Sequence, residues 1–204
     1  MAKRRPVRKV TRAIKGMDAK EVLFDAEGFL SKPSIKIGQA VKYIAMISVI
    51  PALIGLIATY VGLSGRLVPL PVIQLQAMLG ISGLEASIAT FVFTIIGAVV
   101  SLILWGIILH IACKIVGGTK NFNDTLNAVA ASMTPMLLLG WVPFIQILAA
   151  IQGLVILVNG LAKKQNMSIF EASLAVALPI ILIALVGIFV LVSIPVFIPL
   201  QFFA

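Results

Sequence analysis

The sequence predicts an all-α fold, a polytopic membrane helical bundle with five transmembrane helices, and three observations support this prediction. Of the 204 residues, 61% are hydrophobic and only 11% are charged, whereas soluble domains are about half apolar and about a quarter charged. The apolar residues form long runs separated by short polar segments. The basic residues cluster on one side of these runs, as the positive-inside rule requires of a membrane protein.

Residues 1–18 are predicted to be a basic, flexible cytosolic tail. The anionic inner leaflet attracts such tails by roughly 1 kcal/mol per basic residue near the surface. Nucleic-acid binding is the less favoured interpretation of this charge. No apolar run of sufficient length precedes residue 38, so no signal peptide is predicted. The residues expected to contact anionic lipid headgroups are Lys3, Arg4, Arg5, Arg8, Lys9 and Arg12.

Residues 19–37 are predicted to be an interfacial amphipathic helix and a linker. Val22, Ala26 and Phe29 recur at helical spacing, while Asp25 and Glu27 fall largely on the other side. A short helix of this kind is typical of a segment that lies in the plane of the membrane interface. The alternative is an ordinary polar linker.

Residues 38–204 are predicted to form the membrane domain, whose first two spans are 41–63 and 85–116. Pro51 should kink or break the first span. Residues 64–84 are expected to be a loop that packs on the membrane surface. Ser82 and Glu85 have the spacing of a capping box at the start of the second span. That span has a length of about 45 Å, which exceeds the ~30 Å hydrocarbon core, so it should tilt or protrude.

The remaining spans are predicted at 123–139, 143–162 and 172–203. Trp141 and Pro143 mark a very short turn, which makes the third and fourth spans an antiparallel pair. Ser168 and Glu171 form a second capping box just before the last span. Pro179 should interrupt this last helix, as should Pro195 and Pro199 nearer its end.

The distribution of basic residues predicts that the N-terminus is inside and the C-terminus outside. With five spans in this orientation, the inner segments carry fifteen of the sixteen lysines and arginines, and the outer segments carry only Arg66. Removing one span would destroy this asymmetry. The chain is therefore expected to be an integral, multi-pass membrane protein.

The most polar stretch of the membrane domain is 117–135, "GGTKNFNDTLNAVAASMTP". Gly117 and Gly118 should end the second span, Asn121 or Asn123 should cap the third, and Asp124 suits the positive end of that helix. The polar residues within spans three and four are either interhelical hydrogen-bonding groups, which we favour, or the lining of a small polar path. These residues are Asn127, Ser132, Thr134, Gln146, Gln152 and Asn159.

No pattern of catalytic residues is present, so the chain is predicted not to be an enzyme and to need no cofactor. His110 and Cys113 lie one helical turn apart, and Asp124 is the plausible third donor for a metal ion. A metal site needs further ligands, so we expect a packed pair of side chains at a helix end and no metal. Cys113 is the one cysteine in the chain, which excludes an internal disulfide.

The order of these segments resembles the Yip domain family, small polytopic proteins named for binding Ypt/Rab GTPases. The resemblance extends over roughly 20–185 and rests on "FDAEGFL", "CKIVGGTKNFNDTLNAVAASMTPMLLLGWVPFIQIL" and "NGLAKKQNMSIFEASLAVALPIIL". The shared pattern has six parts in this order: a Gly-Gly turn, an aromatic residue, a Thr-Leu pair, a proline after small residues, a Trp/Pro turn and an alanine-rich last helix. The matching residues are Gly117, Gly118, Phe122, Thr125, Leu126, Pro135, Trp141, Pro143, Ala175, Ala177 and Pro179.

The short basic tail differs from the longer acidic or proline-rich region of many eukaryotic members, so the chain looks more like the compact prokaryotic members. The resemblance implies a non-enzymatic role in membrane organisation or in partner recruitment at the cytosolic face, and a plasma-membrane location if the protein is prokaryotic. The alternative function is a small permease or channel that uses the polar residues of spans three and four. The sequence leaves the oligomeric state open, although Gly97, Ala98 and Ser101 would permit the close helix contact of a homo-oligomer.

Overall fold

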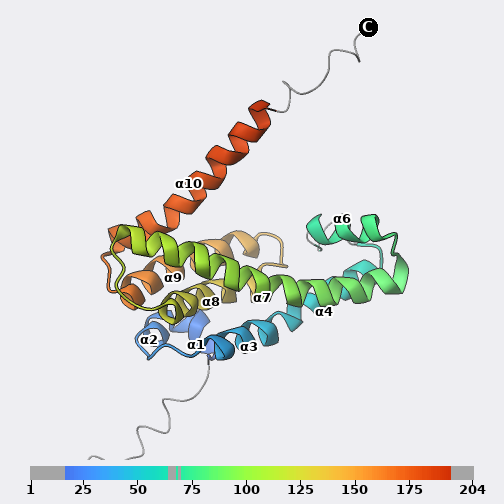
Figure 1. The fold of residues 1–204 in the computed structure, drawn as a ribbon. Coiled ribbons are helices and arrows are strands. Elements are labelled where there is room, and N and C mark those ends of the chain that lie inside the picture. The colour runs from blue at the N-terminus through green and yellow to red at the C-terminus, as the bar shows by residue number, and fades with distance from the viewer. Residues whose placement is uncertain (1–16, 64–67, 69, 194–204) are drawn as a thin grey trace, which may run out of the picture.

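The computed structural model describes residues 17–63, 68 and 70–193, which fold as helices joined by short turns, without a β-strand in that part of the chain (Figure 1). The longest helix, α7, crosses the whole bundle, and α3, α4, α6, α8 and α10 pack along it. The helices are α1 Ala19–Phe24, α2 Ala26–Leu30, α3 Ile37–Ile47, α4 Val49–Tyr60, α6 Leu70–Leu79, α7 Gly83–Val116, α8 Phe122–Leu139, α9 Ile145–Gln165 and α10 Ile169–Ser193.

Four helical segments of the described chain are long and apolar enough to cross a membrane. They are Ile37–Tyr60, Gly83–Val116, Ile145–Gln165 and Ile169–Phe189. The protein is therefore an integral membrane protein with several apolar helices. Helix α8, which corresponds to the predicted third span, is more polar and is not one of these segments. It packs against α3, α7 and α9, so neighbouring helices shield much of its surface.

The first apolar segment is divided into α3 and α4 at Ser48, three residues before Pro51. A proline ring removes one backbone donor and clashes with the carbonyl four residues earlier, which here belongs to Ile47. The break therefore lies where the proline predicted it. Pro51 itself is in the first turn of α4, where the missing N–H has no helical acceptor to lose.

Helices α8 and α9 form a closely packed antiparallel hairpin through the short turn that contains Trp141 and Pro143. Two glycines of α9 permit this approach. A Cβ atom on Gly153 would lie 2.7 Å from the carbonyl oxygen of Ser132, and one on Gly160 would lie 2.9 Å from Cβ of Ala128. Larger residues at either position would push the two helices apart.

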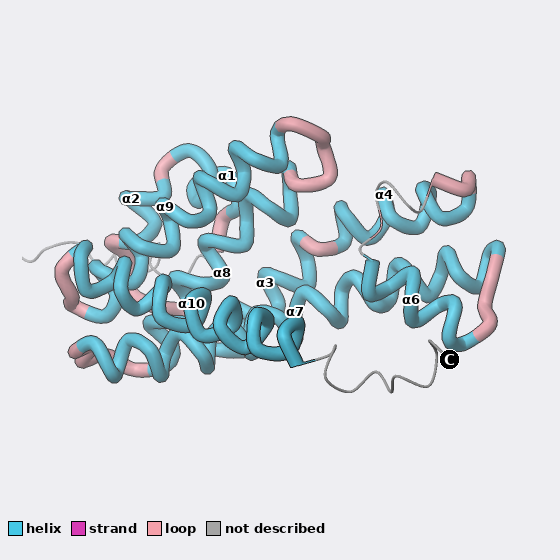
Figure 2. Tube along the Cα trace, turned by 90° about the horizontal axis from the view of Figure 1, so that it is seen from above, coloured by secondary structure: helices cyan, strands magenta, loops and turns pink. Residues whose placement is uncertain are grey.

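Helix α7 has different neighbours along its two halves (Figure 1). Its N-terminal half packs against α4, where the hydroxyls of Thr59 and Thr90 are 3.0 Å apart. Its C-terminal half packs against α8, and Leu126 fills the space beside Gly106. The view from above shows α4 and α6 at one end of the molecule and α1, α2 and α9 at the other (Figure 2).

Helix α10 begins in the bundle and then leaves it at an angle (Figure 1). Ala172, Ala175 and Val176 of its first turns are buried against the other helices, whereas the apolar side chains from Ile180 to Phe189 are more than half exposed. Pro179 was predicted to interrupt this helix, but α10 continues through it to Ser193. A proline is tolerated inside a membrane helix when local adjustments satisfy the backbone groups that it frees. Pro195 and Pro199 lie outside the described residues.

Three local predictions need correction. The loop predicted at 64–84 contains helix α6, and Gln76 in this helix donates 2.7 Å and 2.6 Å hydrogen bonds to Ala86 O and Thr90 Oγ1 of α7. The single amphipathic helix predicted within 19–37 is two helices, because the Asp25 side chain accepts from Gly28 N and starts a new helix there. Ser82 precedes α7 but forms no side-chain capping bond.

Two helix ends have the structure that was predicted, namely the start of α10 and the end of α7. Ser168 N donates to Glu171 Oε2 at 2.8 Å, and Glu171 N donates to Ser168 Oγ at 3.2 Å, which is the reciprocal pair of a capping box. Gly117 ends α7 in the left-handed conformation at a φ of 115°, which favours glycine over any residue with a Cβ.

Candidate functional site

One end of the bundle gathers polar groups and most of the described lysines, and we call it the basic end. It consists of residues 31–36, 114–124 and 163–168, and hydrogen bonds join these three parts. At the opposite end, residues 61–63, 68, 70–82 and 140–144 contain neither lysine nor arginine. The lysines of the basic end are Lys32, Lys36, Lys114, Lys120, Lys163 and Lys164.

Gln165 organises the loop at this end. Its side chain is fully buried and donates from Nε2 to Thr125 Oγ1 at 2.7 Å and to Asn121 O at 3.2 Å. Its Oε1 accepts from Lys120 N at 3.0 Å. A Cβ on Gly118 would lie 3.1 Å from this same Oε1, so the second glycine of the Gly-Gly turn leaves room for the glutamine. Gln165 thus joins the end of α9 to the start of α8.

The sequence analysis did not predict a role for Gln165. The indication of such a role in the sequence was weak, because Gln165 is a single polar residue at the end of an apolar helix, beside two lysines. A glutamine at such a position is usually solvated, and only the fold places the loop 117–121 over its amide.

His110 belongs to the same network. Its Nδ1 lies 2.9 Å from Thr125 Oγ1, and its ring meets Phe122 edge-on with the ring centroids 5.5 Å apart. Cys113 is buried nearby, while the Asp124 carboxylate accepts from Ser34 Oγ and Asn121 N. Among the described residues, no group of three His, Cys, Asp or Glu side chains could hold a metal ion.

Asn127 fastens the segment before α3 to α8. Its side chain is 1% exposed. Its Oδ1 accepts from Ile35 N at 3.1 Å, and its Nδ2 donates to Ile35 O at 2.9 Å and to Asn123 O at 2.7 Å. The amide therefore satisfies both backbone groups of Ile35, much as a neighbouring β-strand would. The adjacent hydrogen bond from Ser34 to Asp124 strengthens the same attachment.

The other polar residues predicted in spans three and four have different surroundings. Thr134 Oγ1 lies 2.9 Å from the hydroxyl of Tyr43 on α3, and Gln152 Nε2 donates to Leu23 O at 2.8 Å. Ser132 and Asn159 donate to carbonyl groups of their own helices, Val129 O and Val155 O. Gln146 is exposed near the start of α9. The structure thus brings Asn127, Thr134 and Gln152 into contacts between elements, and does not bring the six residues together.

The short helices α1 and α2 pack on the α8–α9 hairpin. Val22 is fully buried, Leu30 is 3% exposed, and both lie in a cluster with Ile156 of α9. Lys163 Nζ forms a 2.8 Å ion pair with Glu27 at the margin of this contact. The apolar side of the predicted amphipathic segment therefore packs against the α8–α9 hairpin. Contact between its other side and the membrane interface stays a prediction.

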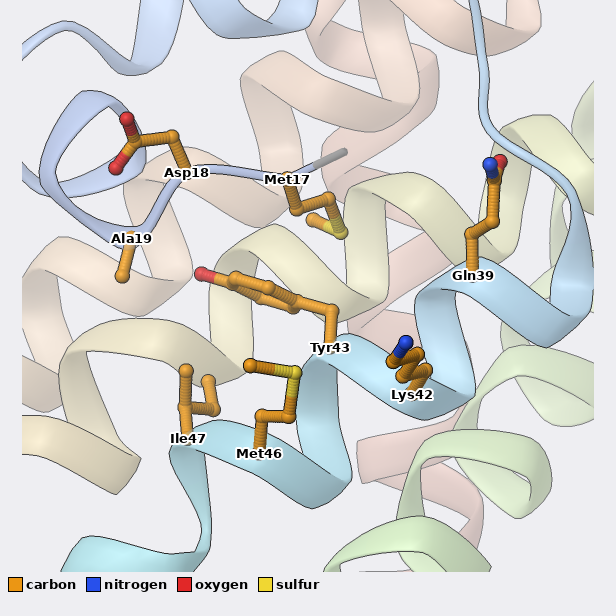
Figure 3. A pocket seen from close by; sticks show the side chains of 8 residues that line it. All are labelled: Met17, Asp18, Ala19, Gln39, Lys42, Tyr43, Met46 and Ile47. Atoms are coloured by element: carbon orange, nitrogen blue, oxygen red, sulfur yellow. The ribbon is translucent and has the colours of Figure 1, made fainter. Parts of the chain in front are cut away.

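An open cavity of about 550 Å³ lies between α1 and α3. Figure 3 shows the side chains that line it, among them the largely apolar Met17, Tyr43 and Met46 and the charged Lys42 and Asp18. The remaining lining residues are Ala19, Gln39 and Ile47. The cavity is thus mainly apolar, with a few charged and polar groups.

The residues of the predicted family motif lie at both ends of the bundle. Trp141 Nε1 donates to Leu138 O at 2.8 Å in the turn of the hairpin, where Pro143 is exposed. Pro135 is buried within α8, and Phe122 begins that helix beside Gly106. The lysines and arginines at 3–12, which were predicted to contact lipid, lie outside the described residues.

Comparison with known protein families matches residues 35–191, which is more than half of the chain, to the family described as Yip1 domain. The matched range begins at the segment fastened by Asn127 and extends into α10. Neither the curated proteins nor the solved structures give a match.

Proposed function

This chain belongs to the Yip1 domain family, and we propose that it is a non-enzymatic integral membrane protein that organises the membrane or recruits a protein partner to the cytosolic face. It has several apolar helices and works in a lipid environment. The proposed partner is a cytosolic or membrane protein that binds at the basic end, and a second copy of the chain is one such partner. In a prokaryote the membrane would be the plasma membrane.

The attachment of residues 17–36 to the hairpin is the observation that carries this proposal. Four contacts far apart in the sequence hold this segment, from Asn127 and Asp124 on α8 and from Gln152 and Lys164 on α9. Most of these bonds go to backbone atoms of the segment, so they fix its path. A polar surface that is fixed in this way at one end of an apolar bundle favours the binding of a partner over the catalysis of a reaction.

The proposed topology has five crossings, with the basic end in the cytosol. The concentration of lysines at this end, together with their absence from the described residues of the opposite end, supports this orientation. Helix α8 would be the fifth crossing. Its polar groups would be tolerated at that depth because they are paired with neighbouring helices.

Site-specific photo-crosslinking in intact cells tests the recruitment proposal. A photo-reactive amino acid is placed at Thr119 in the basic end, and in a matched variant at Phe144, which is 88% exposed in the opposite turn. We expect Thr119 to give a discrete protein adduct, identified by mass spectrometry, and Phe144 to give lipid adducts. The proposal is wrong if neither position gives a protein adduct, or if both give the same set of proteins.

A small permease or channel is the alternative function. Among the described residues, Ser132 and Asn159 form side-chain bonds only within their own helices, and Gln146 is exposed. These three residues are therefore the candidates for contact with a solute. Purified protein in liposomes should pass no ion or small polar solute if the recruitment proposal holds. Uptake that is abolished by Ser132→Ala and Asn159→Leu, with little change in stability, would establish the permease instead.

A further inference from the structure

We propose that the basic end contains a binding pocket for the phosphate-bearing headgroup of an anionic phospholipid. The pocket has a volume of about 410 Å³ and is open to the surrounding surface. Three parts of the chain form it, namely the segment after α2, the start of α8 with the preceding loop, and the last turn of α9. Its lining residues include Lys32, Lys120, Lys163 and Lys164, with Asp124 as the one carboxylate among them.

The charges around the pocket are unevenly neutralised. Lys32 forms an ion pair with Glu21, and Lys163 forms one with Glu27, both at partly or largely exposed side chains. Within the described chain, neither Lys120 nor Lys164 forms an ion pair. Against these two ammonium groups stands the single carboxylate of Asp124, so the pocket keeps a net positive charge.

Lys164 is the strongest indication of a ligand. Its side chain is 8% exposed, yet its ammonium group donates to a single described acceptor, Lys32 O, at 2.5 Å. An ammonium group has three donors, and a buried charge is costly unless it is both paired and hydrogen-bonded. Asp124 attracts Lys164 electrostatically, but among the described residues it forms no ion pair with it. An anionic oxygen in the pocket would accept from the remaining donors. The carboxylate of Asp124 accepts from Ser34 Oγ and Asn121 N, and its charge offsets only part of the positive charge of the pocket.

The position of the pocket favours a lipid headgroup over other anions. Lys163 and Lys164 end a helix that is apolar enough to span the membrane, so their ammonium groups lie where such a helix meets the headgroup layer. Basic pockets between helices at the cytoplasmic surface are typical sites for lipid phosphates. The inference rests on the membrane placement of the chain, and it is independent of whether a protein partner is recruited.

Native mass spectrometry of the full-length protein with phosphatidylglycerol tests this site. We compare the double variant Lys120→Gln/Lys164→Gln with Lys20→Gln/Lys36→Gln, which removes the same charge outside the pocket. The basic tail is unchanged in both, so its contribution cancels. At about fivefold per lysine, the first variant should bind its first phosphatidylglycerol at least ~10-fold more weakly than the wild type, and the second should stay within about twofold.

Three outcomes would overturn the proposal. They are equal weakening in both double variants, equal retention of phosphatidylcholine and phosphatidylglycerol by the wild type, and full protection against thermal unfolding by inorganic phosphate in the absence of lipid. The last result would assign the pocket to a soluble phosphate compound. If the variant with Lys164→Gln does not fold, Lys120→Gln alone replaces it, because the Lys120 side chain is exposed. This single substitution should weaken binding about fivefold.

Discussion

The amide of Asn127 illustrates how single residues stabilise this bundle. A buried amide in an apolar helix is costly unless its donors and acceptor are paired. Asn127 pairs them with the backbone of Ile35 and with Asn123 O, and Gln165 does the same for the loop 117–121. In both cases a side chain on a regular helix satisfies backbone groups of an irregular segment. That is why these positions need an amide and not another small polar group.

Asn127→Leu should destabilise the protein. The substitution leaves both backbone groups of Ile35 without their partners, and hydrogen bonds between membrane helices contribute about 0.6 kcal/mol on average and at most ~2 kcal/mol. We expect a loss of about 2 kcal/mol, seen as a fall of roughly 4–8 °C in the unfolding temperature in detergent. Gln146→Leu is the control, because this exposed side chain should change stability by less than ~0.5 kcal/mol. Equal effects of the two substitutions would contradict the role given to Asn127.

The sequence indicated some of these residues and not their partners. Asn127 and Thr134 stand out as polar residues in an apolar run, and a tie to neighbouring helices could be predicted from residue type alone. That Asn127 binds Ile35, 92 residues earlier, could not, because no periodicity links the two segments. Gln165 was missed because polar residues at a helix end are normally solvated, and only the tertiary fold buries this one.

At the scale of the helices, the α8–α9 hairpin depends on small residues that permit close approach. Gly153 faces the backbone of α8 at Ser132, whereas Gly97 on α7 has no neighbouring atom within 4 Å of the position its Cβ would take. The two positions are both helical glycines in apolar helices. Substitutions at these two positions therefore share the gain in helix propensity over glycine, and they differ in whether the new side chain meets a neighbouring helix.

Gly153→Ala should destabilise the protein, and Gly97→Ala should not. A new methyl group at position 153 would press on a backbone oxygen, and overpacking of this kind costs about 1–3 kcal/mol. At position 97 the alanine should leave stability unchanged or raise it by up to ~1 kcal/mol, because alanine favours the helix more than glycine does. Thermal unfolding in detergent measures both. A more stable Gly153→Ala variant would mean that the hairpin is not closely packed at this point.

Helix existence was more predictable than helix boundaries. The long apolar runs and the Pro51 break follow directly from hydropathy and proline geometry, and the structure has helices there. Helix α6 was missed because a segment with two prolines and a low charge resembles a surface loop, and its attachment to α7 depends on Gln76. The division of 19–30 into two helices depends on Asp25, whose side chain competes with the helix for a backbone N–H.

The whole molecule is an elongated bundle in which α7, about 51 Å long, exceeds the hydrocarbon thickness and carries two separate sets of neighbours. The hairpin and the N-terminal helices cover the half near the basic end, and α4 and α6 accompany the other half. Charge asymmetry predicts which end faces the cytosol. It does not determine whether the polar helix α8 crosses the membrane, because that depends on how its neighbours shield it.

Accessibility of single cysteines in intact cells tests the proposed topology most directly. In a Cys113→Ser background, one variant carries Thr119→Cys in the loop of the basic end, and the other carries Val142→Cys in the turn of the hairpin. A membrane-impermeant maleimide should label position 142 in intact cells and should label position 119 only after the membrane is permeabilised. Labelling of both positions from the same side would contradict the five crossings, because α8 and α9 would then enter and leave through one surface.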